Sequence, residues 1–258
     1  MATYKTKAFI IKRQNFGEAD RIISLFSRDY GKIKVIAKGV RKPLSKLGGH
    51  LELFYFCDFV LTEGKNLETV CGAQIIECFS DFRKNLYATH HAYYLAELID
   101  KLVHENYESK EIFDLFYKSI ALLNQYADTF EVNGSKHLGG GNLLLRYFEL
   151  QLLSQLGHRP EVEHCVKCHG KLIPEGIFWS NELGGALCED CRQYSEVFLG
   201  ISSDVVKLMR LFLSSDISAV RKLNLHKKLE KELENVIEGF LRYVSEKEFN
   251  TKKYVREK

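Results

Sequence analysis

The sequence predicts an α+β protein: a five-stranded barrel of the oligonucleotide-binding (OB) fold, followed by a helical domain with an inserted four-cysteine zinc-finger module. Three observations predict this. Five apolar runs joined by polar turns fill the first 80 residues, helical periodicity follows, and four cysteines form two close pairs. The expected domains are residues 1–80, a nucleic-acid-binding barrel, and residues 81–258, the helical domain with the zinc-binding insert at about 161–195.

The predicted strands are short segments rich in β-branched and aromatic residues. They cover Tyr4–Lys12, Arg21–Ser27, Lys32–Lys38, Leu51–Thr62 and Leu67–Phe79. Polar turns such as NFGEAD and DYG separate them. Five antiparallel strands within about 80 residues fit a small barrel, and the OB fold is the five-stranded barrel to test first.

The predicted helices show apolar residues at a period near 3.6. They cover Tyr87–Val103, Lys110–Tyr126, Leu143–Leu156, Ser203–Leu213 and about Lys227–Lys247. Ser109 is expected to cap the second helix, and Gly157 and Pro160 to end the third. The third helix is so apolar that we expect it at the centre of a bundle. Residues 133–142, NGSKHLGGGN, are expected to form a loop.

The sharpest chemical signal is a pair of C-x2-C motifs separated by 19 residues. The ligands expected from this pattern are Cys165, Cys168, Cys188 and Cys191. Four thiolates suit tetrahedral Zn(II) at about 2.3 Å, and they leave no position for water, so one structural Zn²⁺ ion is predicted. His164 and His169 flank the first pair and could replace a ligand, although a surface or supporting place is the stronger expectation. Two alternatives remain: reduced cysteines that bind no metal, and an iron–sulfur cluster.

Composition limits the class of protein. No uninterrupted apolar run approaches the roughly 20 residues of a membrane span, and the N-terminus lacks an apolar signal region. We therefore expect a cytoplasmic protein without a membrane partner, with cysteines reduced or bound to metal. Small buried hydrophobes are the expected role of the remaining cysteines, Cys57, Cys71 and Cys78.

Positive charge is concentrated at one end of the chain. Residues 1–50 hold 12 Lys and Arg against 3 Asp and Glu, whereas residues 51–258 hold 25 against 31. Charge placed in this way indicates a polyanionic partner, although a solvated loop that is basic by chance is the alternative. If roughly six phosphates are neutralised, raising salt from 50 to 200 mM should cost about three decades of affinity.

The stretch KVIAKGVRKPLSKLGGH, residues 34–50, is expected to form a phosphate-contacting strand and loop. The predicted DNA-binding cations are Lys32, Lys34, Lys38, Arg41, Lys42, Lys46, Arg13 and Arg21. Phe16 and Tyr30 lie in turns and are candidates for base stacking, with packing against the barrel as an equal alternative.

Enzyme signatures are mostly absent. His50-Leu51-Glu52 together with C-x2-C is typical of zinc deaminases, but Pro precedes neither cysteine pair, and four cysteines already close the metal's coordination. LGGGN at 138–142 lacks the Lys-Ser/Thr of a P-loop. No nucleophile elbow is found. We therefore expect no catalytic residue and no small-molecule substrate.

Two stretches of the chain carry patterns that are informative together. Residues 16–54, from FGEADRIISLF to GGHLELF, contain a Gly-Glu-x-Asp turn, a Gly-Lys hairpin and an Ala-Lys-Gly-x-Arg segment. Residues 143–168 and 178–191 contain a Leu-Arg-x-Phe-Glu helix and the two cysteine pairs. In these features the two stretches resemble the N-terminal barrel and the C-terminal part of the bacterial RecO family of recombination mediators. Residues 81–140 and 195–258 match only in being helical. His169-Gly170 stands where Cys-Gly is common in the family.

The resemblance implies a role in DNA repair and homologous recombination. It implies that the protein binds single- and double-stranded DNA, anneals complementary strands and, with RecR, helps to load RecA onto DNA coated by single-stranded DNA-binding protein (SSB). The C-terminal tail of SSB is an implied partner, and association with the nucleoid is expected. Charge pattern alone leaves open a zinc-stabilised OB-fold RNA-binding or regulatory factor, because RNA and DNA share phosphate contacts. An enzyme of unknown chemistry is the third alternative.

Overall fold

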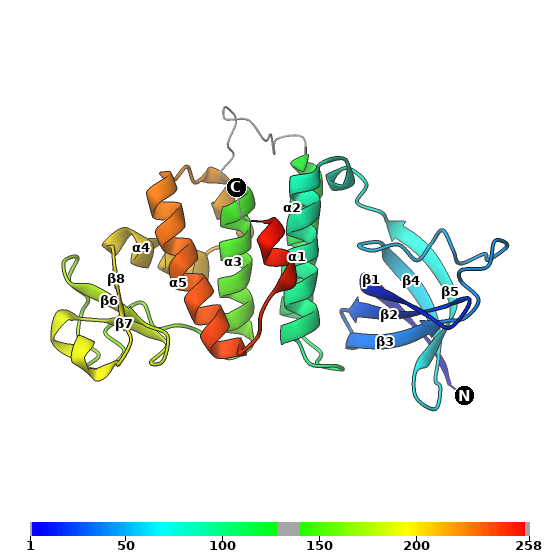
Figure 1. Ribbon diagram of the computed structural model, residues 1–258, viewed down its shortest axis with the longest axis horizontal. Coiled ribbons are helices and arrows are strands. Elements are labelled where there is room, and N and C mark those ends of the chain that lie inside the picture. The colour runs from blue at the N-terminus through cyan, green and yellow to red at the C-terminus, as the bar shows by residue number, and fades with distance from the viewer. Residues whose placement is uncertain (1, 128–139, 256–258) are drawn as a thin grey trace. The chain divides into compact units, whose positions relative to one another are not determined.

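The computed structural model describes residues 2–127 and 140–255 (Figure 1). The chain forms two compact units, Met1–Asp128 with Thr251–Lys258, and Thr129–Asn250. The first unit holds the barrel together with two long helices, and the second holds three helices and the cysteine-bearing module. The expected boundary at residue 80 separates the barrel from the helices, and its meaning as a domain boundary stays a prediction.

Five strands close into a barrel in the order β1-β2-β3-β5-β4. They are β1 (Thr3–Phe16), β2 (Asp20–Ser27), β3 (Gly31–Ala37), β4 (Phe56–Thr62) and β5 (Glu68–Glu77). β1 and β4 pair antiparallel to close the barrel, and β3 and β5 pair parallel. This order and closure confirm the predicted five-stranded OB barrel.

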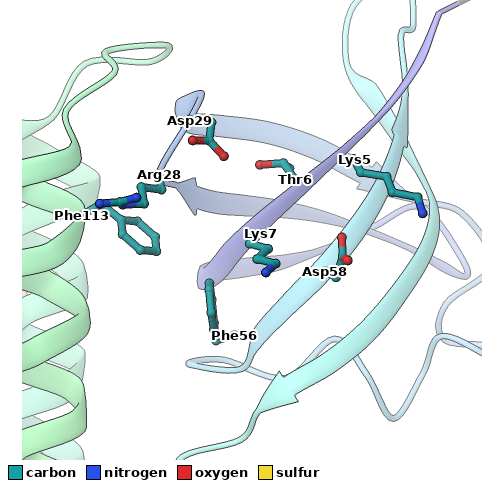
Figure 2. A pocket seen from close by; sticks show the side chains of 8 residues that line it. All are labelled: Lys5, Thr6, Lys7, Arg28, Asp29, Phe56, Asp58 and Phe113. Carbon is teal, nitrogen blue, oxygen red and sulfur yellow. The ribbon is translucent and has the colours of Figure 1, made fainter.

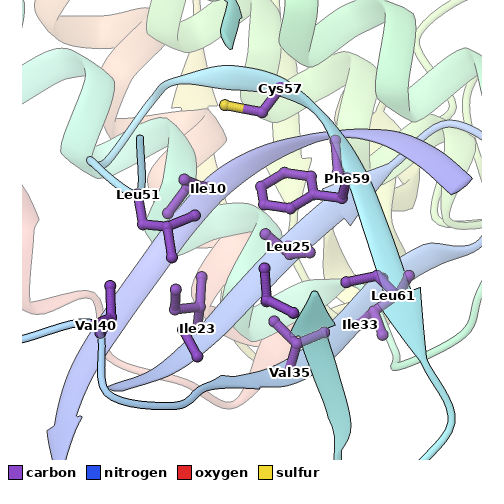
Figure 3. Packing of buried hydrophobic residues seen from close by; sticks show 13 residues of the cluster. Ile10, Ile23, Leu25, Ile33, Val35, Val40, Leu51, Cys57, Phe59 and Leu61 are labelled. Atoms are coloured by element: carbon purple, nitrogen blue, oxygen red, sulfur yellow. The ribbon is translucent and has the colours of Figure 1, made fainter. Parts of the chain in front are cut away.

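The barrel interior is filled by the apolar side chains that alternate along each strand (Figure 3). They include Ile10, Ile23, Leu25, Ile33, Val35, Cys57, Phe59 and Leu61. Val40 and Leu51, which lie outside the strands, also pack into this core. Burial of these side chains fixes the register of the strands, because a shift by one residue would turn them to the outer face.

Two helices complete the first unit, α1 (Leu86–Leu102) and α2 (Lys110–Gln125), with the short 3-10 helices η1 (Phe82–Lys84) and η5 (Asn250–Tyr254). The Ser109 hydroxyl accepts a hydrogen bond of 3.2 Å from the backbone N–H of Ile112, which confirms the predicted cap of α2. Phe9, on the outer face of β1, packs edge-on against Phe116 of α2 with ring centroids 5.2 Å apart. Aromatic packing of this kind holds the barrel against α2.

The second unit contains α3 (Gly140–Gln155), α4 (Ser203–Ser214) and α5 (Lys227–Ser245), with the 3-10 helices η3 (Glu189–Tyr194) and η4 (Ile217–Lys222). α3 packs against both α4 and α5, and its side chains are buried nearly all round. A small sheet of β6 (Ile177–Ser180), β7 (Gly185–Leu187) and β8 (Leu199–Ile201) runs in the order β7-β6-β8. The apolar helix predicted at the centre of a bundle is therefore α3.

Several element limits differ from those predicted. β4 begins at Phe56 and not at Leu51, because Phe54 adopts a left-handed backbone conformation (φ 65°) and the apolar side chain of Leu51 turns into the barrel without pairing. Of the predicted loop 133–142, residues 133–139 lie outside the described residues, whereas residues 140–142 already belong to α3. Among the described helices, none is both long and apolar enough to span a bilayer.

Candidate metal centre and nucleic-acid interface

The four predicted cysteine ligands lie together. The Sγ atoms of Cys165, Cys168, Cys188 and Cys191 all lie within 4.8 Å of one another. The Cys168 and Cys188 sulfurs are 3.8 Å apart, which is too long for a disulfide. Tetrahedral Zn–S bonds of about 2.3 Å would place two sulfurs at about this separation. The donor set and its spacing therefore fit a four-thiolate metal site.

The chain between the two pairs explains how they meet. β6 and β7 form an antiparallel hairpin, and Cys188 follows β7 directly. The N–H of Val166 donates to the Ala186 carbonyl at 2.8 Å, so the first pair is tied to the same hairpin. The 19-residue spacer therefore contains the hairpin that brings the second cysteine pair to the first. His164 and His169 are both exposed and lie outside the thiol cluster.

The electrostatics of the cluster favour a cation. Burial, and after it the neighbouring thiol groups, raise the pKa of Cys191 to about 12. Burial also raises the pKa of Cys165, but backbone N–H donors, including that of Cys168, outweigh it and lower this pKa to about 6. Four crowded thiolates repel one another, so a bound cation is what would let all of them ionise together.

The basic stretch forms a loop at one end of the barrel. We call residues 38–50 the basic loop. Its start is fixed to the β1–β2 turn: the Asp20 carboxylate accepts the N–H of Gly39 at 2.7 Å, and the Ala19 carbonyl accepts the N–H of Arg41 at 2.9 Å. Asp20 was not predicted as a site residue, although it is the Asp of the Gly-Glu-x-Asp turn. The loop and this turn therefore form one surface.

Four predicted cations of this surface are exposed. They are Lys38, Arg41, Lys42 and Lys46. Within the part of the chain that the structure describes, none of the four is found in an ion pair. Arg21 and Arg13 lie at the edge of the loop, where Arg21 donates to Asn15 at 3.3 Å and Arg13 pairs with Glu52 at 2.5 Å. The unpaired loop cations are thus the most available for phosphate.

Lys32 and Lys34 have protein partners instead. Lys32 is only 7% exposed, and its ammonium donates to the Asp100 carbonyl at the end of α1. Lys34 forms an ion pair with Glu105, and the hydrogen bond that its ammonium donates to that carboxylate raises the pKa of Lys34. Both strand lysines therefore face the helices of the first unit. Their DNA-binding role stays a prediction that this placement does not favour.

The two aromatic candidates lie at different ends of the barrel. Phe16 ends β1 beside the basic loop and is 51% exposed. Tyr30 lies in the β2–β3 turn at the other end of β2, and its ring packs against Tyr4 with centroids 4.7 Å apart. Phe16 is therefore placed to meet a strand held by the loop, whereas Tyr30 is not.

A second candidate surface is a hollow of about 390 Å³ on the flank of the first unit. Figure 2 shows its lining from β1, β4, the β2–β3 turn and α2: Lys5, Thr6, Lys7, Arg28, Asp29, Phe56, Asp58 and Phe113. Its charges are mixed. Arg28 is already paired with Asp114 at 3.1 Å, and Lys7 stands opposite Asp58 in the strand register. The hollow is therefore less suited to a polyanion than the basic loop.

Comparisons with known proteins identify the family. Residues 1–79 match the model of the recombination protein O N-terminal region, and residues 83–253 match that of its C-terminal region. A DNA repair protein RecO from Dehalococcoides mccartyi is 36% identical over 95% of this chain and 92% of its own. Proteins of the same name from Roseiflexus sp. and Acetivibrio thermocellus are 34% and 30% identical, over 95% and 98% of this chain and 82% and 96% of theirs.

The fold and site define an OB-barrel protein with a basic loop and a four-cysteine module whose thiols are compatible with a metal site. The matches extend this to a family: the chain belongs to the RecO family of DNA repair and recombination proteins. This agrees with the resemblance of residues 16–54 and 143–191 to that family.

Proposed function

We propose that this protein is a recombination mediator that binds single- and double-stranded DNA and anneals complementary strands. With RecR, it helps to load RecA onto SSB-coated single-stranded DNA, and the SSB tail is one of its contacts. It works in the cytoplasm on the nucleoid, without enzymatic chemistry of its own. The observation that carries the proposal is the basic loop, where four exposed cations, none of them in an ion pair among the described residues, lie beside an exposed aromatic ring.

Annealing follows from the electrostatics of this loop. Two complementary strands repel each other through their phosphates, and cations held by a protein neutralise that repulsion. Lys38, Arg41, Lys42 and Lys46 supply those cations on a loop whose ends are fixed to the barrel. No proton transfer or bond cleavage is needed, so the absence of a catalytic motif is consistent with this function.

The proposal includes one structural Zn²⁺ held by Cys165, Cys168, Cys188 and Cys191. The ion would join the two ends of the β6–β7 hairpin segment and supply folding free energy to a small module. Because the site has four protein ligands, it leaves no position for water or substrate. The metal therefore supports the module and takes no part in chemistry.

The test is annealing of complementary oligonucleotides coated with SSB. The native protein is compared with a variant carrying Lys38→Glu, Arg41→Glu and Lys42→Glu. We expect the native protein to anneal them and the variant to lose the activity, because three attractive contacts become repulsive. Native circular dichroism and melting of the variant would show that it is folded.

The matched control carries Lys227→Glu, Lys228→Glu and Lys231→Glu, which changes the net charge equally at exposed positions in α5. We expect it to anneal like the native protein. Equal loss in both variants would mean that net charge alone governs binding, which contradicts the proposed surface. Failure of the native protein to anneal DNA, with preferential binding of structured RNA, would favour the RNA-binding alternative.

A further inference from the structure

The basic loop carries an apolar residue at its tip. Leu44 is 96% exposed, more than any other large hydrophobic residue in the described chain. It stands between Lys42 and Lys46 in sequence, directly after Pro43. Full exposure of a leucine is unfavourable in water, and here it occurs among the exposed cations of the basic loop.

The loop is built so that this leucine stays outside. Val40 and Leu51 are buried in the barrel core, and Leu47 packs against it, so both arms of the loop are anchored. At the tip, the N–H of Ser45 donates to the Lys42 carbonyl at 3.0 Å. This closes a turn with Pro43 and Leu44 at its centre, and proline at the first central position stiffens it. The apolar tip is therefore held rigidly, away from the core that accepts its neighbours.

We propose that Leu44 is a wedge that inserts between neighbouring bases of a DNA strand held by the basic loop. The proposal rests on the DNA-binding role inferred for this loop. Cations position the phosphates, and an apolar side chain beside them has the base faces as its natural partner, because the phosphates and sugars are polar. Exposed leucine and proline side chains can unstack base steps in this way.

A wedge suits annealing. A single strand stacks on itself, and opening its base steps extends the strand and frees its bases to align with a second strand. Leu44 would open a base step without reading its identity, since every base has an apolar face. The exposed ring of Phe16, at the end of β1 and next to the turn that holds the start of the loop, offers a second apolar face to the unstacked bases.

The test uses a single-stranded oligonucleotide containing 2-aminopurine, whose fluorescence rises when it is unstacked. We expect the native protein to raise the fluorescence at saturation. We expect Leu44→Ala to remove about half or more of that rise and to slow annealing about threefold to tenfold, because the cations remain but the wedge is gone. Leu44→Met, which keeps an apolar side chain of similar size, should retain both.

Two controls separate this inference from the function on which it rests. Leu86→Ala removes another exposed leucine, at the first position of α1, and should leave the fluorescence and annealing unchanged. If Leu44→Ala keeps the full fluorescence rise while the triple charge reversal abolishes binding, the wedge is wrong and the DNA surface stands. If the triple reversal also binds normally, the proposed surface itself is wrong.

Discussion

Gly31 shows how a single residue holds the first unit together. Its φ is +64°, and a Cβ placed there would lie 2.2 Å from the Tyr107 carbonyl oxygen, in the segment between α1 and α2. Nearby, the N–H of Asn106 donates to the Lys32 carbonyl at 3.0 Å. We expect Gly31→Ala to lower the free energy of unfolding by roughly 2–4 kcal/mol, because backbone strain and a backbone clash add. Urea denaturation would measure this loss.

Gly17→Ala is the matched control for that experiment. Gly17 also has a positive φ, of +54°, but nothing lies within 4 Å of the added Cβ. The loss in the free energy of unfolding should be limited to the strain of the left-handed conformation, about 1 kcal/mol. Equal losses at the two positions would show that the contact with the Tyr107 backbone does not matter.

The lysines of β3 show what residue patterns leave undetermined. Alternation along the strand correctly predicts that Ile33 and Val35 point inward and that Lys34 points outward. It does not say what covers the outer face. The groups that cover it are Asp100, near the end of α1, and Glu105, just beyond it, about 70 residues further along the chain. The Asp100 carbonyl accepts a hydrogen bond from Lys32, and Glu105 forms an ion pair with Lys34. The sequence could not separate these lysines from those of the basic loop, because no local signal reports such contacts.

At the scale of elements, the four-cysteine module takes its thiols from two short segments that the β6–β7 hairpin brings together. We expect Cys188→Ser to reduce the bound metal from about one ion per chain toward none, because a three-thiolate site binds zinc less tightly. Trp179, the single tryptophan of the chain, is buried in β6, within the hairpin that joins the two cysteine pairs, and its ring packs edge-on against Phe240 of α5. Its fluorescence transition should therefore move to lower denaturant concentration.

Cys71→Ser is the matched control for that variant. The expectation that Cys71 is buried was wrong, because it is an exposed free cysteine in β5, outside the thiol cluster. Its replacement should change neither the metal content nor the Trp179 transition. Unchanged metal content in Cys188→Ser, measured by elemental analysis, would mean that the four cysteines do not form the metal site.

The elements themselves follow closely from local patterns, and their ends do not. The five barrel strands and the five α-helices fall where the sequence patterns predict them. The start of β4 was misplaced because residues 51–55 are as apolar and aromatic as a strand. Their burial comes from packing around the barrel end, with Phe54 in a conformation that sequence periodicity does not reveal. The two cysteine pairs were easier to predict, because metal coordination imposes strict spacing.

At the scale of the whole molecule, positive charge is concentrated in the first 50 residues, the rest of the chain is net negative, and the total net charge is small. The chain carries a formal net charge of only +3, although its first 50 residues hold nearly a third of the Lys and Arg. DNA affinity should therefore depend on where the cations lie and not on the total. Four loop cations predict that log affinity for single strands falls with log salt at a slope of about −2.8. This is shallower than expected if Lys32 and Lys34 also bound phosphate.

A pair of single substitutions tests this at the level of the intact protein. Lys46→Ala removes an exposed loop cation. We therefore expect the slope of log affinity against log salt to become less steep by about 0.7. Lys34→Ala removes a cation already paired with Glu105 and should leave the slope unchanged. Both slopes are obtained from fluorescence anisotropy of a labelled oligonucleotide between 50 and 200 mM salt, conditions under which a slope of −2.8 corresponds to about a fiftyfold loss of affinity. If instead the slope becomes less steep in Lys34→Ala, then the ion pair with Glu105 opens when DNA binds. The DNA surface would then extend from the basic loop along β3.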